Sequence, residues 1–273
     1  MEDSFTLGNG VRMPAIGFGT WEISPDDTAE TAVRTALEMG YRHIDTAKIY
    51  GNEQGIGRAV RASGVPREEI FITTKLWNSD HAYDDAMQSI DGSLERLGLE
   101  YVDLYLIHWP QSDARDEAWK ALTEIYESGK AKSIGVSNYT VRHLEELLGQ
   151  SDVVPMVNQV EFHPFIYEQQ KDLVDYCKDK NILIEAYSPL SRHSKTSHPE
   201  IEQIAEQAGK TPSQVILRWC LQHGTVPLPR SQNPDHIKEN LEIFDFELDD
   251  QAMETLNSLS DGDRVTSDPE DIP

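Results

Sequence analysis

The sequence has little cysteine and no long apolar run. Its two cysteines, Cys177 and Cys220, show neither CxxC spacing nor a histidine at metal-ligand spacing. We therefore expect two reduced helix residues and no bound metal. No segment approaches the roughly 20 apolar residues that cross a bilayer. The N-terminus MEDSFTLGNG carries two acids where a secretory signal has basic residues. We expect a cytoplasmic protein without a membrane partner.

Basic residues are scarce relative to acidic ones. The 273 residues include 24 Lys and Arg against 48 Asp and Glu, a formal net charge of −24. Such a field repels phosphodiester backbones, so we expect no nucleic acid partner. An acidic surface of this size suits a saline habitat, where salt screens self-repulsion, and we favour halophilic adaptation over an ordinary acidic cytosolic protein. Residues 261–273, DGDRVTSDPEDIP, are expected to form a mobile acidic tail.

Linkers and low-complexity tracts are also missing, so we expect one domain over residues 1–273. Short β-branched or apolar runs alternate with longer helical patterns almost from end to end, after a hairpin around Asn9 and Gly10. Strict alternation indicates βαβ units, and eight units close a barrel. We predict an α/β protein, a (β/α)8 TIM barrel with an N-terminal β-hairpin. The expected strands are 15–19, 41–45, 70–76, 102–108, 132–137, 156–161, 182–188 and 225–229.

Two common nucleotide-binding patterns do not fit this sequence. GFGTWE lacks the third glycine of GxGxxG, and GIGRAV falls inside an expected helix instead of after a strand. The segment around GKT at 209–211 has Ile204 where a P-loop needs glycine. A doubly wound dinucleotide-binding domain and a P-loop nucleotidase are therefore rejected.

Four polar residues fall at the carboxyl end of three consecutive expected strand units, which is the active-site face of a barrel. They are Asp45, Tyr50, Lys75 and His108. A phenol titrates near pH 10, so it donates a proton at neutrality only where its anion is stabilised, and a lysine paired with an aspartate supplies that charge. A histidine beside them orients a carbonyl oxygen. The set suits protonation of a carbonyl, with a hydride donor as partner.

Taken singly, each of the four residues is more often structural: a helix cap, a packed ring, a strand-end lysine or a hydrogen-bonded histidine. Together at one end of successive strands they indicate a site. The alternative of a barrel hydrolase would use Asp45 and a water molecule, and it predicts activity without a cofactor.

The segments GFGTW, YRHIDTAKIYGNEQGIGRAV, ITTKLW, LYLIHWP, IGVSNY, NQVEFHP and EAYSPL together resemble, in order, the signatures of the aldo-keto reductase family. Among its members, the sequence resembles the short-loop prokaryotic type, such as diketogluconate and methylglyoxal reductases. The resemblance implies a (β/α)8 barrel that reduces aldehydes and ketones with NADPH. It makes Tyr50 the general acid, Lys75 and Asp45 the pair that tunes its pKa, and His108 the residue that orients the carbonyl.

The resemblance also implies a cofactor site. It assigns Ser137, Asn138 and Gln159 to the nicotinamide carboxamide, Tyr187 to stacking on the ring, Ser188 and Leu190 to the pyrophosphate, and Arg230, Ser231, His236, Glu239 and Asn240 to the adenosine end.

Two positions depart from the family pattern. Arg230 stands where the family usually has lysine, and His236 where it usually has arginine. A guanidinium still grips a 2′-phosphate, whereas an imidazole is a weaker, pH-dependent partner. We expect NADPH, with NADH as an alternative.

Three tryptophans, Trp21, Trp77 and Trp109, directly follow strand ends, and we expect them to wall a substrate pocket. Short connections after the fourth and seventh strands favour an open mouth and small carbonyl substrates such as dicarbonyls and keto sugars. We expect a monomer. The alternative from another class is a regulatory barrel protein that binds the cofactor with little turnover.

Overall fold

Eight short parallel strands form one sheet in which spatial neighbours follow chain order, β3 through β10. The computed structural model describes residues 3–25, 27–111, 114–193 and 195–272. The strands are built from apolar and β-branched runs that are buried on both faces, as in all six residues of β5. They are β3 (Phe18–Gly19), β4 (His43–Asp45), β5 (Phe71–Leu76), β6 (Leu104–Ile107), β7 (Ile134–Ser137), β8 (Val157–Glu161), β9 (Leu183–Tyr187) and β10 (Val226–Leu228).

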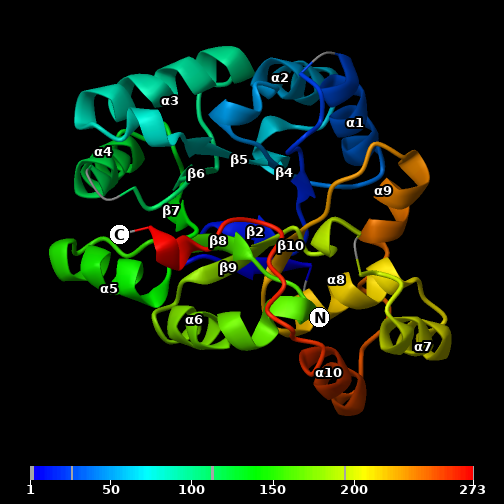
Figure 1. Cartoon of the computed structure of the whole chain (residues 1–273). Coiled ribbons are helices and arrows are strands. Elements are labelled where there is room, and N and C mark those ends of the chain that lie inside the picture. The colour runs from blue at the N-terminus through cyan, green and yellow to red at the C-terminus, as the bar shows by residue number, and fades with distance from the viewer. Residues whose placement is uncertain (1–2, 26, 112–113, 194, 273) are drawn as a thin grey trace.

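Helices follow the strands and cover the outside of the ring (Figure 1). Local signals set their ends: α3 stops at Gly98 with φ 63°, and α8 begins with a capping box between Thr211 and Gln214. The α-helices are α1 (Asp27–Glu38), α2 (Glu53–Ala62), α3 (Tyr83–Leu97), α4 (Arg115–Glu127), α5 (Val141–Gln150), α6 (Tyr167–Asp179), α7 (Pro199–Ala208), α8 (Pro212–Gln222), α9 (Pro234–Leu241) and α10 (Asp250–Asn257). Short 3₁₀ turns are η1 (Lys48–Tyr50), η2 (Arg67–Glu69), η3 (Asn78–Asp80), η4 (Pro164–Ile166), η5 (Ser191–His193) and η6 (Pro269–Asp271).

Two backbone hydrogen bonds between the segments that contain β3 and β10 close the ring. The N–H of Gly17 donates to the carbonyl of Pro227, and the N–H of Gly19 donates to that of Pro229, both at 3.0 Å. The approach is so close that a Cβ on Gly17 would lie 2.5 Å from Leu228 Cδ2. A larger residue at Gly17 would require the side chains of Leu228 and His43 to move, so glycine suits the point where the barrel closes. The (β/α)8 prediction is confirmed, and each strand is shorter than expected.

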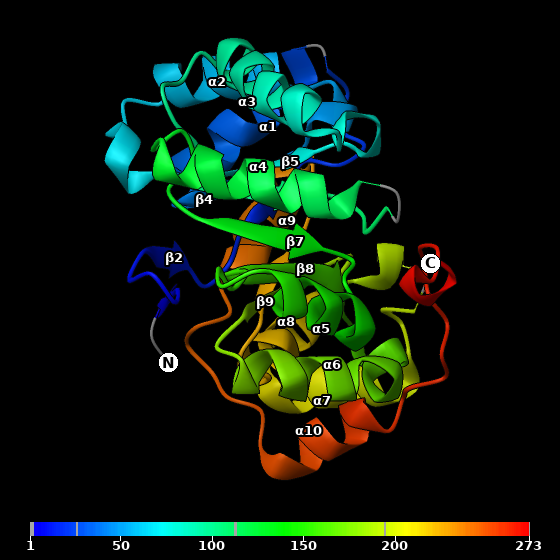
Figure 2. The same ribbon diagram turned by 90° about the vertical axis from the view of Figure 1, so that its left-hand side faces the viewer.

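The hairpin and the C-terminal segment lie at opposite ends of the barrel (Figure 2). Strands β1 (Ser4–Thr6) and β2 (Arg12–Pro14) pair antiparallel, as predicted. Their turn is fixed where Asn9 Nδ2 donates to the carbonyl of Lys132, just before β7. The hairpin therefore covers the amino ends of the strands and leaves the carboxyl ends for a site.

Residues 261–272 run beside the carboxyl ends of the strands. The N–H of Asp261 donates to the carbonyl of Phe165, and Arg142 Nη2 donates to the carbonyl of Ile272. The segment thus has contacts that a solvated tail lacks, and its expected mobility stays a prediction. Both cysteines are free and buried, Cys177 on α6 and Cys220 on α8, as expected.

Candidate active site

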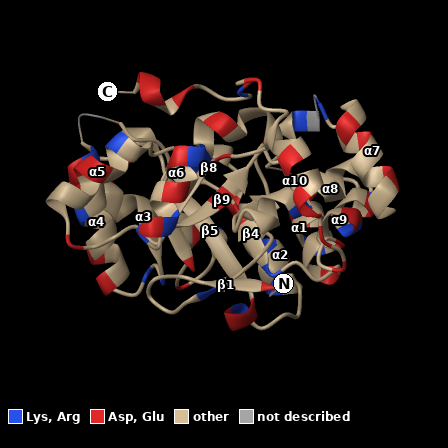
Figure 3. Cartoon of the chain, turned by 90° about the horizontal axis from the view of Figure 1, so that it is seen from below, with Lys and Arg blue, Asp and Glu red and all other residues tan. Residues whose placement is uncertain are grey.

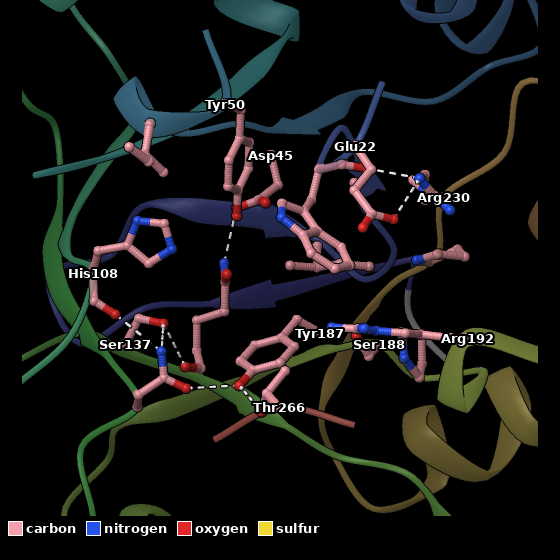
Figure 4. A pocket seen from close by; sticks show the side chains of 18 of the residues that line it. Glu22, Asp45, Tyr50, His108, Ser137, Tyr187, Ser188, Arg192, Arg230 and Thr266 are labelled. Carbon is pink, nitrogen blue, oxygen red and sulfur yellow. Dashed lines mark hydrogen bonds and ion pairs between the residues drawn. The ribbon is translucent and has the colours of Figure 1, made fainter. Parts of the chain in front are cut away.

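A cavity of about 490 Å³ opens at the carboxyl ends of the strands. Figure 4 shows Tyr50, Asp45 and His108 on one side of it and Tyr187, Ser188 and Arg192 on the other. The residues that line it are Gly19, Trp21, Glu22, Asp45, Ile49, Tyr50, Trp77, His108, Trp109, Ser137, Asn138, Gln159, Tyr187, Ser188, Pro189, Leu190, Arg192, Leu228, Pro229, Arg230 and Thr266.

A buried ion pair lies beneath Tyr50. Lys75 on β5 donates from Nζ to both carboxylate oxygens of Asp45 on β4, each at 2.8 Å, and to the carbonyl of Thr46 at 2.8 Å. The ammonium has three hydrogens, and these three acceptors take them. Tyr50 Oη lies 3.5 Å from Nζ, so the interaction of Lys75 with the phenol is mainly one of charge.

Burial and charge act in opposite directions on the phenol. Burial raises the pKa of Tyr50, Lys75 lowers it and Asp45 raises it, with a raised pKa as the net result. For Lys75, burial alone lowers the pKa, but Asp45 and Tyr50 outweigh burial, and the pKa is raised. At neutral pH the phenol therefore keeps its proton and the ammonium keeps its charge, which is the state that a general acid needs.

His108, directly after β6, faces the phenol. Its ring lies edge-on to Tyr50, with centroids 5.8 Å apart, and edge-on to Trp77 at 5.1 Å. Burial lowers the pKa of His108 well below 6.5, and the charges of Lys75 and His81 lower it further. The imidazole is thus neutral at pH 7. It can hydrogen-bond a carbonyl oxygen but adds no positive charge there.

A rigid group of hydroxyls and amides forms the opposite wall. Asn138, with φ 63°, donates from Nδ2 to the carbonyl of His108 and to Ser137 Oγ, and Tyr187 Oη donates to its Oδ1 at 2.8 Å. Ser137 Oγ in turn donates to the carbonyl of Gln159 at 2.8 Å. These hydrogen bonds use the hydrogens of the three side chains and constrain their positions, so the group offers fixed acceptor oxygens to a planar amide.

A second, smaller cavity of about 100 Å³ lies nearby, and Arg230 lines both cavities. The guanidinium of Arg230 donates to the carbonyl of Trp21 and pairs with Glu22, each at 3.2 Å. Because this pair is exposed, it holds the arginine weakly. The smaller cavity is lined by Ser213, Arg230, Ser231, His236, Glu239 and Asn240.

The polar groups that line the two cavities together fit a nicotinamide dinucleotide. The first offers amide and hydroxyl groups of the kind that bind a carboxamide, and the second adds an arginine and a histidine of the kind that bind a phosphate. Every residue assigned to the cofactor by resemblance lines one of the two. Lys75 lies beneath the first cavity, and the three predicted tryptophans line it with partly exposed rings. Their roles toward substrate and cofactor stay predictions.

Arg192, Thr266 and Glu185 are among the residues at the site that were not identified from the sequence. Arg192 lies with its guanidinium 4.5 Å from the ring centroid of Trp21, across the mouth of the cavity. Thr266 lines the cavity from the C-terminal segment, and no local pattern marks it. Glu185 lies inside the barrel next to Gln159. An acid in the middle of the apolar strand ILIEAYS was the available signal for it.

Within residues 3–25, 27–111, 114–193 and 195–272, no three His, Cys, Asp or Glu side chains are grouped so as to bind a metal ion. In the same part of the chain, no helix has the length and apolar character needed to cross a membrane.

Comparisons with known proteins agree on one family. The model of the Aldo/keto reductase family matches residues 15–261. Glyoxal reductase of Bacillus subtilis (strain 168) is 47% identical over 272 residues, covering 100% of this chain and 98% of that protein. An aldo-keto reductase from a Medee basin deep-sea metagenome library superposes with a TM-score of 0.94 at 45% identity, covering 97% of this chain and 98% of that one. An aldo-keto reductase of Bombyx mori in complex with NADP superposes with a TM-score of 0.91 at 34% identity, covering 97% and 94%.

Proposed function

We propose that this chain, which belongs to the aldo/keto reductase family and so is an NAD(P)H-dependent oxidoreductase, reduces small aldehydes and ketones with Tyr50 as the proton donor. One observation carries the proposal: a protonated phenol lies over a buried Lys75–Asp45 pair and beside a neutral histidine, in the larger of the two cavities.

Different residues of the site bind the carbonyl substrate and transfer the proton. A reduced nicotinamide, when bound, supplies a hydride for the carbonyl carbon. His108 binds the carbonyl oxygen and directs it toward Tyr50, which gives that oxygen its proton. Lys75 offsets the negative charge that develops on the phenol, and Asp45 keeps Lys75 in place. The product is an alcohol.

The cofactor would lie across both cavities. Ser137, Asn138 and Gln159 would hold the carboxamide, and Tyr187 would cover the ring. Support for NADPH over NADH comes from Arg230 and His236 in the smaller cavity, since both can bind a 2′-phosphate.

Small dicarbonyls and keto sugars are the proposed substrates. The relative from Bacillus subtilis is a glyoxal reductase. Trp77 and Trp109 wall the cavity near His108, while Trp21, whose relative exposure is 36%, lies at its edge. Because His108 lines the same cavity, a small carbonyl compound that enters it would lie close to the imidazole.

The test compares wild type with Tyr50→Phe and with Tyr126→Phe, a control tyrosine on α4 outside both cavities. NADPH oxidation is followed with methylglyoxal and glyceraldehyde, and NADPH affinity is measured separately. Loss of a positioned proton donor is expected to lower kcat by about 10²- to 10⁴-fold. Tyr50→Phe should keep its NADPH affinity, and Tyr126→Phe should behave as wild type.

Other outcomes would identify the alternatives. Tight NADPH binding by wild type without turnover of any carbonyl would favour the regulatory barrel protein. Activity that needs no cofactor would favour a hydrolase that uses Asp45. Full activity of Tyr50→Phe would remove Tyr50 as proton donor and leave the family assignment intact.

A further inference from the structure

A carboxyl group that the reaction does not use lies inside the barrel, below the cavity. Glu185 is in the middle of β9, with 0% relative exposure. The strand register places it opposite Gln159 of β8. The side chains meet inside the ring, where Gln159 Nε2 donates to Glu185 Oε2 at 2.8 Å.

The same amide nitrogen also contacts the ion pair under Tyr50. Gln159 Nε2 donates to Asp45 Oδ2 at 2.8 Å, and that oxygen accepts from Lys75 as well. A primary amide has two hydrogens, and the carboxyl groups of Asp45 and Glu185 take both. The carbonyl oxygen of Gln159 is then the only part of the amide that can interact with a molecule in the cavity.

We propose that Glu185 is a positioning residue, which with Asp45 fixes the Gln159 amide so that its carbonyl oxygen faces the cavity and accepts a hydrogen bond from the NH₂ of the nicotinamide carboxamide. The inference rests on the proposed function and deepens it, because this contact helps to decide which face of the ring is turned toward the substrate. Without Glu185 one amide hydrogen has no partner, and the amide can turn.

The surroundings of Glu185 favour a neutral carboxyl group in this role. Burial and the nearby charge of Asp45 raise the pKa of Glu185 from 4.5 to about 8, against the lowering effects of Gln159 and Lys75. On its other side, Oε1 lies 3.4 Å from His43 Nε2, and the pKa of His43 is lowered to about 3 by burial and by Lys75. A neutral acid can carry its proton on Oε1 and accept with Oε2, so glutamine should imitate it.

The experiment pairs variants of Glu185 with two forms of the cofactor. Affinities for NADP⁺ and for its 3-acetylpyridine analogue, in which a methyl group replaces the carboxamide NH₂, are measured by tryptophan fluorescence, since three tryptophans line the cavity. The proteins are wild type, Glu185→Gln, Glu185→Leu and Glu185→Ser. Glu53→Gln is the control, because it alters a buried carboxylate that pairs with Arg96 and lies outside both cavities.

The preference for NADP⁺ over the analogue is the readout, because a loss of stability alone does not change a ratio of two affinities. We expect about a tenfold preference in wild type, corresponding to one buried hydrogen bond. It should persist in Glu185→Gln and Glu53→Gln and fall below about threefold in Glu185→Leu. If Glu185→Leu does not fold, Glu185→Ser replaces it, because its small side chain leaves room for water. Its preference for NADP⁺ should also fall below about threefold.

The outcomes separate this inference from the proposed function. If Glu185→Leu and Glu185→Ser keep the wild-type preference, Glu185 is only structural and the inference is overturned. The same holds if wild type binds both cofactors equally, although the reductase assignment then stands. If wild type binds neither form, the proposed function fails, and the inference fails with it.

Discussion

Lys75 shows why the four polar residues at strand ends act as one group. Its side chain has no exposed surface, and its three hydrogen bonds hold Asp45 and the backbone at Thr46 in place. Removing either partner of such a pair leaves a buried charge without compensation. The pair therefore fixes a positive charge beneath Tyr50, whose own side chain is partly exposed.

His81 offers a residue-level prediction of pH dependence. It has 2% relative exposure, neither of its ring nitrogens has a hydrogen-bond partner among the described residues, and burial, partly offset by Asp80, lowers its pKa to about 4. Below pH 6.5, His81 is protonated in the unfolded chain but stays neutral in the folded protein. Between pH 6.5 and 4, His81 should therefore cost about 1.4 kcal/mol of stability per pH unit.

The variant His81→Leu tests this expectation by urea unfolding at several pH values. Its stability at pH 7 should equal or exceed that of wild type, since no hydrogen bond to a described residue is lost. Its loss of stability on acidification should be smaller by about one proton. Equal acid slopes in the two proteins would mean that His81 is protonated in the folded state or partnered by water.

The candidate catalytic residues near strand ends could be predicted from the sequence, whereas side-chain contacts between strands could not. Asp45, Lys75 and His108 each lie at or next to the carboxyl end of a strand, and in a parallel barrel all these ends meet at one mouth. The role of Glu185 depends on the register of β9 against β8, because a shift of one residue would turn the carboxylate out of the barrel. The departure at Arg230 was visible in the sequence, but its pairing with Glu22 required the structure.

At the scale of elements, the position of the C-terminal segment depends on Glu161, the last residue of β8. Glu161 is buried and accepts from the N–H groups of Val265 and Thr266, at 2.7 and 3.1 Å, and from the hydroxyl of Thr266. His163 Nε2 lies 2.9 Å from the same carboxyl group. Thr266 Oγ1 also lies 3.0 Å from Tyr187 Oη, so the segment contacts the proposed ring-stacking residue.

Glu161→Ala is expected to release the C-terminal segment, because three hydrogen bonds to one carboxylate are lost together. Limited proteolysis should then cut within residues 262–268, where wild type resists, and affinity for NADP⁺ should fall severalfold as Tyr187 loses its neighbour Thr266. Glu168→Ala, on the exposed start of α6, is the matched control and should resist like wild type. Rapid cleavage of wild type at the same bonds would instead favour the mobile tail expected from composition.

That tail also shows a limit of sequence-based prediction. DGDRVTSDPEDIP is acidic and contains few apolar residues, and those features are typical of a mobile terminus. Its partners, Phe165, Glu161 and Arg142, lie about 100 or more residues earlier in the chain. No local pattern indicates a contact of that range. The eight strands were predictable because each depends on its own run of apolar residues.

For the molecule as a whole, the dominant electrostatic feature is the charge of −24. Figure 3 shows acidic positions on several of the outer helices. Mutual repulsion between these groups acts over a Debye length of about 10 Å at 0.1 M salt and about 3 Å at 1 M. If the surface is adapted to saline conditions, screening should stabilise the fold.

We therefore expect the melting temperature at pH 7 to rise by several degrees between 0.1 and 1 M KCl. A gain of 1 kcal/mol corresponds to roughly 2–4 °C for a domain of this size. Near pH 4.6, the sequence-derived isoelectric point, the net charge vanishes and the effect of salt should shrink, which is the internal control. A melting temperature that is unchanged or lower in KCl at pH 7 would favour an ordinary acidic enzyme.

The closure of the ring at Gly17 and Gly19 also governs how the chain can be made. The segment from Gly17 to Gly19, which includes β3, leaves the ribosome early, but its partner around Pro227 is synthesised about 210 residues later. At roughly 5–20 residues per second, the first strand waits about 10–40 s with an open edge. During translation this protein should therefore depend on chaperones. On a ribosome stalled before residue 227, the nascent chain lacks the partner of its first strand, so its barrel should stay open.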